Sequence, residues 1–349
     1  MRASARVAGL YGVLRFRGNQ GISTREGLIH AHGKAGRPEG DRTMFYREKK
    51  VDCGTYREVD IIPRTDDAER AAKGTRKKRS KVSTPAQKNL NEKNAKRYLV
   101  QVGNGNFGPG DLHISATYSP ENLPGTLEEA EKNAANFLHR IAYRMGKLGL
   151  PPLKYILVTE YAYPKDDTEG KPVRIHHHII INGGLDRDVV ELMWTKKRIN
   201  WKRFEADKAY ADTVERLGWV NADRIQTNEN GVEALCRYIM KNPKGKKRWS
   251  SSRNLVRPVE QPPADHKYSR RQVERLAKSG DHGREYFQKK FPAYEVTEVR
   301  PEYYDETGWH IYIKMWKKKC KREKTQELQK KGKKNEPSTD QHMGGEDRG

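Results

Sequence analysis

Apolar residues occur with two kinds of spacing along the middle of the chain, and these spacings predict its strands and helices. Alternating or β-branched apolar runs predict strands, whereas apolar residues three or four positions apart predict amphipathic helices. The predicted strands are Tyr98–Val102, Leu112–Tyr118, Tyr155–Tyr161, the histidine-bearing run 174–181 and the short Arg224–Thr227. The predicted helices are a segment beginning at Thr126 and ending before Leu150, and the segments Asp186–Lys197 and Val232–Asn242.

From Leu112 onward the predicted order is strand, helix, strand, strand, helix, strand and helix. This order resembles a ferredoxin-like, split βαβ antiparallel sheet of the α+β class. In that arrangement the helices cover one face of the sheet, and the other face is open. We expect the histidines of the run 174–181 to lie on the open face.

The remaining segments divide the chain into five predicted parts. Residues 1–43 form a Gly- and Arg-rich tail, and Met44 is an alternative start of the protein. A basic segment and linker follows at 44–97, and the folded domain spans 98–254, with order beginning near Tyr98. An accessory region at 255–316 includes a possible hairpin of Tyr294–Val299 and Trp309–Met315, whose role the sequence does not indicate. Residues 317–349 form a charged, low-complexity tail.

The charge balance points to a polyanionic partner. The 349 residues hold 70 Lys and Arg against 46 Asp and Glu, which gives a formal net charge of +24. The pI is about 9.8, the mean hydropathy is -1.03 and the hydrophobic content is 34%. Such values are typical of a nucleic-acid-binding protein, part of whose charge lies in tails without a core.

Cysteines and apolar runs indicate the compartment. The three cysteines, Cys53, Cys236 and Cys320, are far apart and lack the paired spacing of a zinc finger or ribbon. No apolar run approaches the ~18 residues of a membrane span. The sequence therefore predicts a soluble, cytoplasmic protein with no membrane partner.

The histidine triplet is the strongest sign of chemistry. Side chains alternate along a strand, so His176 and His178 share one face while His177 points to the other. If the preceding strand pairs with this one across the connection 164–172, Glu160 lies opposite His176. The three side chains would form a facial site for Mg²⁺ or Mn²⁺, although zinc also binds such ligands. The alternatives are chance surface histidines and a carboxylate that needs no function.

The helix predicted at Val232–Asn242 supplies the next component. Its apolar positions at helical spacing define a core face, consisting of Val232, Leu235, Cys236 and Ile239. Tyr238 lies about 110° from the centre of this face, and Lys241 lies about one turn further along the same flank. The core requires neither residue. The alternative for Tyr238 is ordinary packing of an aromatic ring with a hydrated hydroxyl.

A His-x-His strand followed by Tyr238-Ile239-Met240-Lys241 resembles the HUH endonucleases, in particular the single-tyrosine rolling-circle replication initiators of plasmids and phages. The middle position of the triplet is usually a bulky hydrophobe in that family, and here it is His177. The resemblance implies a divalent metal on His176 and His178, with Glu160, and a nucleophilic Tyr238 assisted by Lys241. It also implies a 5′-phosphotyrosine intermediate in a bacterial host cell.

The same resemblance implies the DNA partner. The substrate would be single-stranded or hairpin origin DNA, because a phosphate inside a duplex is hard to reach. Six residues near the site in sequence are candidates for DNA binding, namely Arg174, Lys244, Lys246, Lys247, Arg248 and Trp249. Each of these has the alternative of a solubilising surface residue. No phosphate-binding loop of a helicase is evident in the sequence, so a host helicase would unwind the duplex and a host DNA polymerase would extend the 3′ end.

Two other functions remain open at this point. A single-tyrosine transposase or a relaxase would share the histidines and the tyrosine, but would recognise different DNA. A non-catalytic protein that binds RNA or single-stranded DNA on an open sheet would leave the histidines incidental. The sequence lacks the aromatic-rich signature expected of such an RNA-binding sheet.

Overall fold

The computed structural model describes residues 44–73, 85–162, 173–241 and 248–318. The predicted tail at 1–43 and nearly all of that at 317–349 lie outside these residues. The described residues divide into two compact units, one of Met44 with 64–73 and 85–91 and the other of 45–63 with 92–162, 173–241 and 248–318. In the described part of the first unit lies α1, Asp66–Lys73. The second unit contains most residues of the sheets and helices discussed below.

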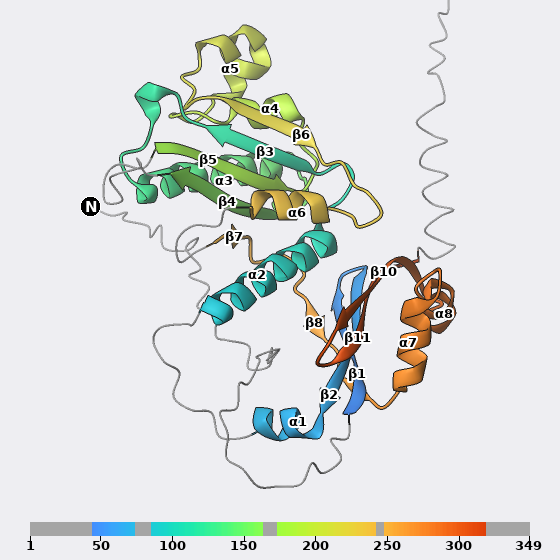
Figure 1. The fold of residues 1–349 in the computed structure, drawn as a ribbon. Coiled ribbons are helices and arrows are strands. Elements are labelled where there is room, and N and C mark those ends of the chain that lie inside the picture. The colour runs from blue at the N-terminus through green and yellow to red at the C-terminus, as the bar shows by residue number, and fades with distance from the viewer. Residues whose placement is uncertain (1–43, 74–84, 163–172, 242–247, 319–349) are drawn as a thin grey trace, which may run out of the picture. The chain divides into compact units, whose positions relative to one another are not determined.

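The histidine strand lies at the centre of a five-stranded antiparallel sheet of order β6-β3-β5-β4-β7 (Figure 1). Its strands are β3 (Leu112–Thr117), β4 (Tyr155–Ala162), β5 (Val173–Ile181), β6 (Val220–Arg224) and β7 (Ser250–Ser251). The structure is thus a mixed α+β fold, as predicted. The predicted short strand at Arg224–Thr227 lies earlier in the chain, because the residues that alternate toward the core are Val220 and Ala222.

One face of this sheet packs against α3 (Leu127–Lys147) and α4 (Arg187–Leu192). The predicted helix start at Thr126 is confirmed, since its side chain accepts a hydrogen bond from the Glu129 amide. The helix predicted at 186–197 is shorter, because the chain beyond Leu192 pairs with a later segment. There the Leu217 amide donates to the Trp194 carbonyl over 3.1 Å. Trp194 itself is fully buried.

The opposite face was expected to be open, and this expectation is wrong for part of it. Two helices cover it, α2 (Pro85–Asn106) and α6 (Glu233–Ile239), through a core that includes Val102, Cys236 and Ile180. Figure 1 shows α6 on the side of the sheet away from α3. The end of the sheet that carries His176 is not part of this core.

The strand predicted at Tyr98–Val102 is wrong, because these residues belong to α2. A short, continuous apolar run fits a buried strand or a buried helix equally well. The following glycines permit the helix: a Cβ on Gly103 would lie 2.5 Å from Cys236 Sγ, and one on Gly105 would lie 2.3 Å from Cys53 Sγ. The end of α2, which carries these glycines, is therefore packed closely on its neighbours.

A second antiparallel sheet has the order β10-β11-β2-β1-β8, with β9 also paired to β1. Its strands are β1 (Met44–Cys53), β2 (Tyr56–Thr65), β8 (Val259–Glu260), β9 (Ala264–Asp265), β10 (Tyr294–Tyr304) and β11 (Gly308–Lys317). The helices α7 (Arg270–Lys278) and α8 (Arg284–Lys290) share its core. The possible hairpin at 294–315 is confirmed. Order begins at β1 rather than near Tyr98.

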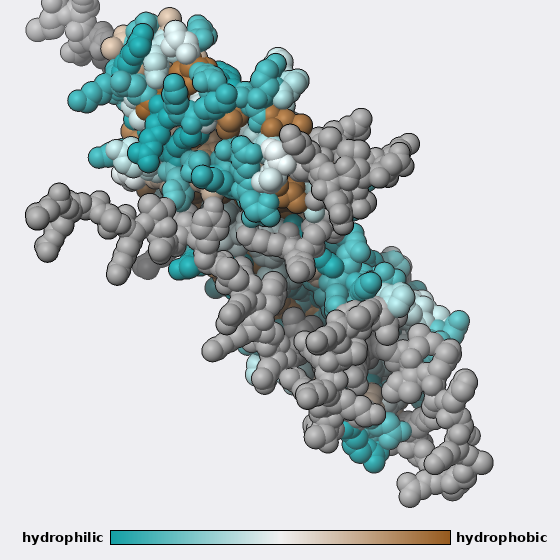
Figure 2. All heavy atoms as spheres, turned by 90° about the vertical axis from the view of Figure 1, so that its left-hand side faces the viewer, coloured by the Kyte–Doolittle hydropathy of each residue, from teal (hydrophilic) through white to brown (hydrophobic). Residues whose placement is uncertain are grey.

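The remaining described elements are α5 (Trp201–Ala206) and two short 3-10 helices, Pro120–Asn122 and Lys208–Thr213. Most described side chains on the face shown in Figure 2 are hydrophilic, and hydrophobic ones show only in small areas between them. Within the described part of the chain, none of the helices combines the length and the apolar character needed to cross a membrane.

Candidate functional site

Glu160, His176 and His178 come together on one face of the first sheet. The strands β4 and β5 pair so that Glu160 lies opposite His176, as predicted from the sequence. His176 Nε2 lies 3.3 Å from Glu160 Oε2, and His178 Nε2 lies 3.9 Å from the same oxygen. One ligand atom from each residue lies within 4.8 Å of the others, so the group could hold a metal ion. Neighbouring antiparallel strands create this cluster from residues that are far apart in sequence.

His178 is held from behind by two residues of β3. Its Nδ1 lies 3.3 Å from His113 Nε2 and 3.4 Å from Ser115 Oγ. The pKa of His178 is lowered to about 4, chiefly by burial and also by the neighbouring His113 and His176, while the charge of Glu160 opposes the shift. We assign the proton of the neutral ring to Nδ1, since this assignment gives a hydrogen bond to His113. The lone pair of Nε2 then points to Glu160, as metal binding requires.

Sequence reasoning did not find His113. Strand alternation was the available signal, because His113, Ser115 and Thr117 share one face of β3 and pair with the histidine strand. Burial lowers the pKa of His113, and the charge of Asp223 opposes that shift. The ring stacks on His178 with centroids 5.5 Å apart. His113 therefore fixes the orientation of a candidate metal ligand.

His177 points to the other face, as predicted. It is fully buried, and its Nε2 and Nδ1 lie 2.9 Å and 3.0 Å from the hydroxyls of Tyr118 and Thr159. Its pKa is lowered to about 3, chiefly by burial and also by His176 and His178. A neutral His177 in this position packs the core behind the cluster.

Tyr238 lies beside the cluster. Its ring meets the His178 ring edge-on with centroids 5.3 Å apart, and 58% of the residue is exposed. The predicted core face of α6 explains this placement, because Cys236 and Ile239 are buried and turn Tyr238 away from the core. Lys241 lies just beyond the helix and is exposed, and its amide donates to the Tyr238 carbonyl.

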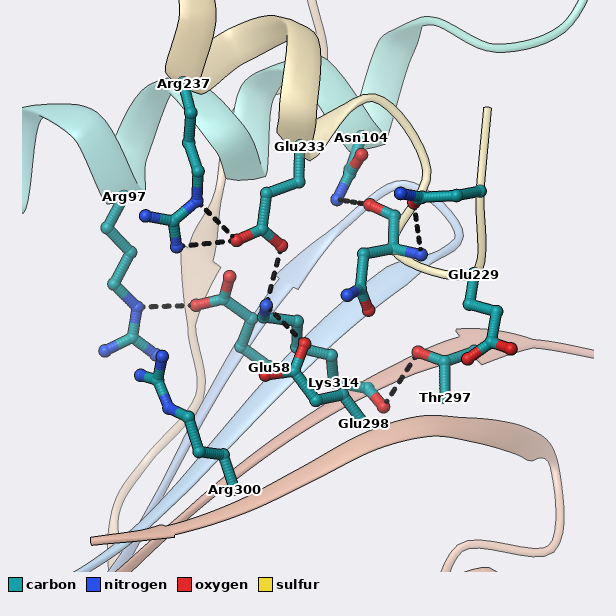
Figure 3. Close-up of polar contacts among 12 residues, drawn as sticks. Glu58, Arg97, Asn104, Glu229, Glu233, Arg237, Thr297, Glu298, Arg300 and Lys314 are labelled. Atoms are coloured by element: carbon teal, nitrogen blue, oxygen red, sulfur yellow. Dashed lines mark hydrogen bonds and ion pairs between the residues drawn. The ribbon is translucent and has the colours of Figure 1, made fainter. Parts of the chain in front are cut away.

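Contacts at the first turn of α6 hold this short helix in place (Figure 3). A single turn or two of helix is marginal by itself, so its neighbours decide where it lies. The buried Asn104 of α2 accepts a hydrogen bond from the Val232 amide over 2.8 Å and donates to the Asn230 carbonyl over 3.1 Å. Trp316 of β11 donates to the Glu229 carbonyl. A Cβ on Gly231, whose φ is +69°, would meet both Asn104 and Trp316.

A buried ion-pair network anchors the same turn. Glu233 receives Lys314 Nζ at 2.6 Å and Arg237 at 2.6 Å, and Lys314 also contacts Glu298 at 2.7 Å (Figure 3). Burial acts to raise the pKa of Glu233, but hydrogen bonds and charges from Lys314 and Arg237 outweigh it and lower the pKa. The hairpin β10–β11, whose role the sequence left open, thus holds the tyrosine helix.

A second set of charges ties α2 to the other sheet. Arg97 contacts Glu58 at 2.6 Å and Asp60 at 2.7 Å, and Gln101 donates to Glu58 over 2.8 Å. The Arg97 pair with Glu58 is visible beside the Glu233 network in Figure 3. Both sets join the helices over the histidine face to β2 and β11.

The predicted DNA-binding residues fall mostly outside what the structure describes. Lys244, Lys246 and Lys247 lie in the undescribed segment 242–247, and only the backbone of Arg174 is described. Arg248 is half-buried, and the half-buried Trp249 ring packs near Tyr98 with centroids 6.1 Å apart. Trp249 also packs against the core shared by α2 and α6. DNA binding by these residues stays a prediction.

Comparisons with known proteins give no relative. No family model, no curated protein and no solved structure matches the chain.

Proposed function

We propose that this protein nicks and rejoins single-stranded DNA with Tyr238 as the nucleophile, and that it initiates rolling-circle replication in the manner of the HUH endonucleases. The observation that carries the proposal is the contact of Tyr238 with His178, 5.3 Å between ring centroids, at a cluster that could hold a metal ion. A nucleophile beside a metal site is the arrangement that phosphoryl transfer to a side chain needs.

The strand order supports the fold that this proposal implies. Counted along the chain from β3, the strands β6-β3-β5-β4 have the order 4-1-3-2 with antiparallel neighbours. A helix connects the first strand to the second, and helical segments connect the third to the fourth. A ferredoxin-like sheet would have the same strand order, so this order supports that part of the proposal, with β7 as an additional strand at the edge beside β4.

Glu160, His176 and His178 would hold the metal, and we propose Mg²⁺ or Mn²⁺. The donor set fits, because two neutral imidazoles and one carboxylate leave further positions for phosphate oxygens and water. A bound divalent cation would withdraw electron density from the scissile phosphate and offset negative charge as it develops there. The hydrogen bond from His178 to His113 orients the ring for this role.

The chain's own residues carry the transfer. The Tyr238 oxygen attacks phosphorus, the bond from phosphorus to the 3′ oxygen breaks, and the strand leaves with a free 3′-hydroxyl. The proton lost by the phenol balances the one gained by that hydroxyl. The Lys241 ammonium would offset negative charge on the Tyr238 oxygen as Tyr238 reacts. The phosphotyrosine preserves one ester bond, so attack by a 3′-hydroxyl reverses the reaction.

The substrate we propose is single-stranded or hairpin origin DNA, with strand separation by a host helicase and extension by a host DNA polymerase. The net charge of +24 favours binding to the phosphate backbone. The candidates for these contacts remain Arg174, Lys244, Lys246, Lys247, Arg248 and Trp249.

The experiment is a covalent-adduct assay. Full-length protein is incubated with Mn²⁺ and a single-stranded DNA library that has a randomised core and a labelled 3′ end, then denatured in detergent. Attack by tyrosine leaves the 3′ fragment on the protein, so a 3′ label should migrate with it and a 5′ label should not. Tyr238→Phe should abolish the adduct, and the exposed control Tyr143→Phe should leave it unchanged.

Two outcomes contradict the proposal. An adduct that persists in Tyr238→Phe would show that another residue is the nucleophile. Intact DNA binding without an adduct at any metal tested would favour a non-catalytic binding protein.

A further inference from the structure

Trp219 occupies the same face of the sheet as the histidine cluster. It directly precedes β6, where Val220 and Ala222 turn toward the core shared with α3. Alternation therefore directs Trp219 to the opposite face, with His176 and Glu160. The Thr117 amide donates to the Trp219 carbonyl over 2.8 Å, which extends the pairing of β3 and β6 by one residue.

The register aligns these residues in one row across four neighbouring strand ends. Thr117 lies opposite His176, and His176 lies opposite Glu160. Trp219 pairs with Thr117 on its other side. Strands in a sheet are about 4.8 Å apart, so the backbone of Trp219 lies about 10 Å from that of His176.

Trp219 is held rigidly but its side chain is uncovered. Its carbonyl also accepts a hydrogen bond from Thr117 Oγ1 over 3.1 Å, which fixes the backbone. The residue is 83% exposed, more than any other large hydrophobic residue among those the structure describes as exposed. A rigid, uncovered indole is a platform on which a planar group can stack with little loss of entropy.

A hollow lies at the end of the row that carries Thr117 and His176. It has a volume of about 370 Å³, and Thr117, His176, Leu123 and Ile175 are among the residues that line it. Such a volume is within the range of small-ligand sites. Two residues that line it, Thr117 and His176, also stand between Trp219 and Glu160 in the row.

We propose that Trp219 stacks against an unpaired base of single-stranded DNA and thereby sets the position of the neighbouring phosphate over the histidine cluster. This inference rests on the proposed function for the identity of the ligand, and it adds the base-binding site that lies beside the scissile phosphate. Single-stranded DNA is the occupant because the row leads to a cluster suited to phosphate and the chain carries a net charge of +24.

The test measures binding without cleavage. Full-length protein is titrated into a fluorescein-labelled oligo-dT 12-mer with EDTA present, and the anisotropy gives the Kd. Trp219→Ala should weaken binding about 5- to 150-fold, the range for loss of one stacked base, and Trp219→Phe should restore most of it. Tyr143→Ala removes an exposed aromatic residue from α3 on the other face and should change the Kd less than about twofold.

A series of 12-mers with one abasic position locates the base. In the wild type, one abasic position should weaken binding as much as Trp219→Ala does, and in Trp219→Ala the same position should have no further effect. Unchanged affinity in Trp219→Ala, equal loss in Tyr143→Ala, or no binding of the wild type would overturn the proposal. Trp219-dependent binding of the matching RNA, tighter than that of the DNA, would overturn the choice of DNA.

These measurements are independent of the tyrosine chemistry. Loss of affinity in Trp219→Ala without any Tyr238 adduct would sustain the base-binding site and reject nicking. An adduct that forms normally while Trp219→Ala binds DNA as the wild type does would reject the base-binding site alone.

Discussion

Replacing Lys314 with methionine should destabilise the protein and displace the tyrosine helix. The ammonium of Lys314 contacts Glu233 at 2.6 Å and Glu298 at 2.7 Å, and its side chain is only 15% exposed. The Glu298 side chain is 26% exposed and can hydrate after the change, whereas the Glu233 side chain is 9% exposed and cannot. The cost therefore falls on Glu233.

The size of the destabilisation depends on the partners that Glu233 retains in Lys314→Met. Loss of a hydrogen bond to a charged, buried group costs about 1.5–3 kcal/mol, and a buried charge left without any partner costs about 3–5 kcal/mol. Arg237 remains bonded to Glu233 at 2.6 Å, so the lower range applies. We expect Lys314→Met to lower the free energy of unfolding by about 2 kcal/mol.

Urea unfolding of a double-mutant cycle measures this interaction. The cycle contains the wild type, Lys314→Met, Glu233→Gln and the double variant, and the coupling free energy should reach about 1 kcal/mol or more. The control Lys278→Met breaks an exposed pair with Glu274 and should cost less than about 0.5 kcal/mol. A coupling within about 0.3 kcal/mol of zero would refute the reasoning.

The lowered pKa of Glu233 also predicts how the stability difference between wild type and Lys314→Met depends on pH. The pKa of Glu233 is lowered in the folded protein, so the unfolded state binds more protons in the acid range. The contribution of ionised Glu233 to the free energy of unfolding is complete above the ordinary carboxylate pKa of about 4.3. This contribution is lost as the pH falls through the lowered pKa of Glu233. The stability difference between wild type and Lys314→Met should shrink over that window. Adduct formation by Lys314→Met should also fall, while its Mn²⁺ affinity stays unchanged.

Two further predictions concern the cluster and the second sheet. His113→Ala should weaken Mn²⁺ binding about 10- to 100-fold by calorimetry because His178 loses its orienting partner, whereas the exposed His139→Ala should have no effect. Equal Mn²⁺ affinities of the wild type and His113→Ala would show that His113 does not support the metal site. Burial acts to raise the pKa of Glu48, but hydrogen bonds from Tyr268 and lysines lower it from 4.5 to about 2. Glu48→Gln should therefore lose about 3 kcal/mol at neutral pH, and the difference in unfolding free energy should vanish as the pH falls from about 4.5 to about 2. A difference that grows in acid would contradict that sign.

The spacing of residues within a single strand or helix correctly predicted which side chains of the candidate site face the same way. Alternation alone separates His176 and His178 from His177, and the structure buries only His177 completely. Helical spacing likewise turns Tyr238 away from the core of α6. These features depend on the period of the backbone, which the sequence expresses directly.

Other features depended on partners that sequence spacing does not show. Tyr98–Val102 reads as a strand, yet it lies in a helix because Gly103 and Gly105 allow close contact with Cys236 and Cys53. The continuous apolar run does not distinguish the two structures until its neighbours are in place.

The sequence by itself determined the central α+β pattern, the facing of the histidines and the exposed side of the tyrosine helix, since each follows from backbone periodicity. The sequence placed Glu160 opposite His176 only on the condition that the two strands pair, and the tertiary structure supplied that pairing. The tertiary structure alone decided that His113 supports His178 and that Lys314 holds Glu233. It also placed Trp219 in the row of the cluster. These features depend on strand register and on packing between distant segments, and burial of the hydrophobic cores determines both.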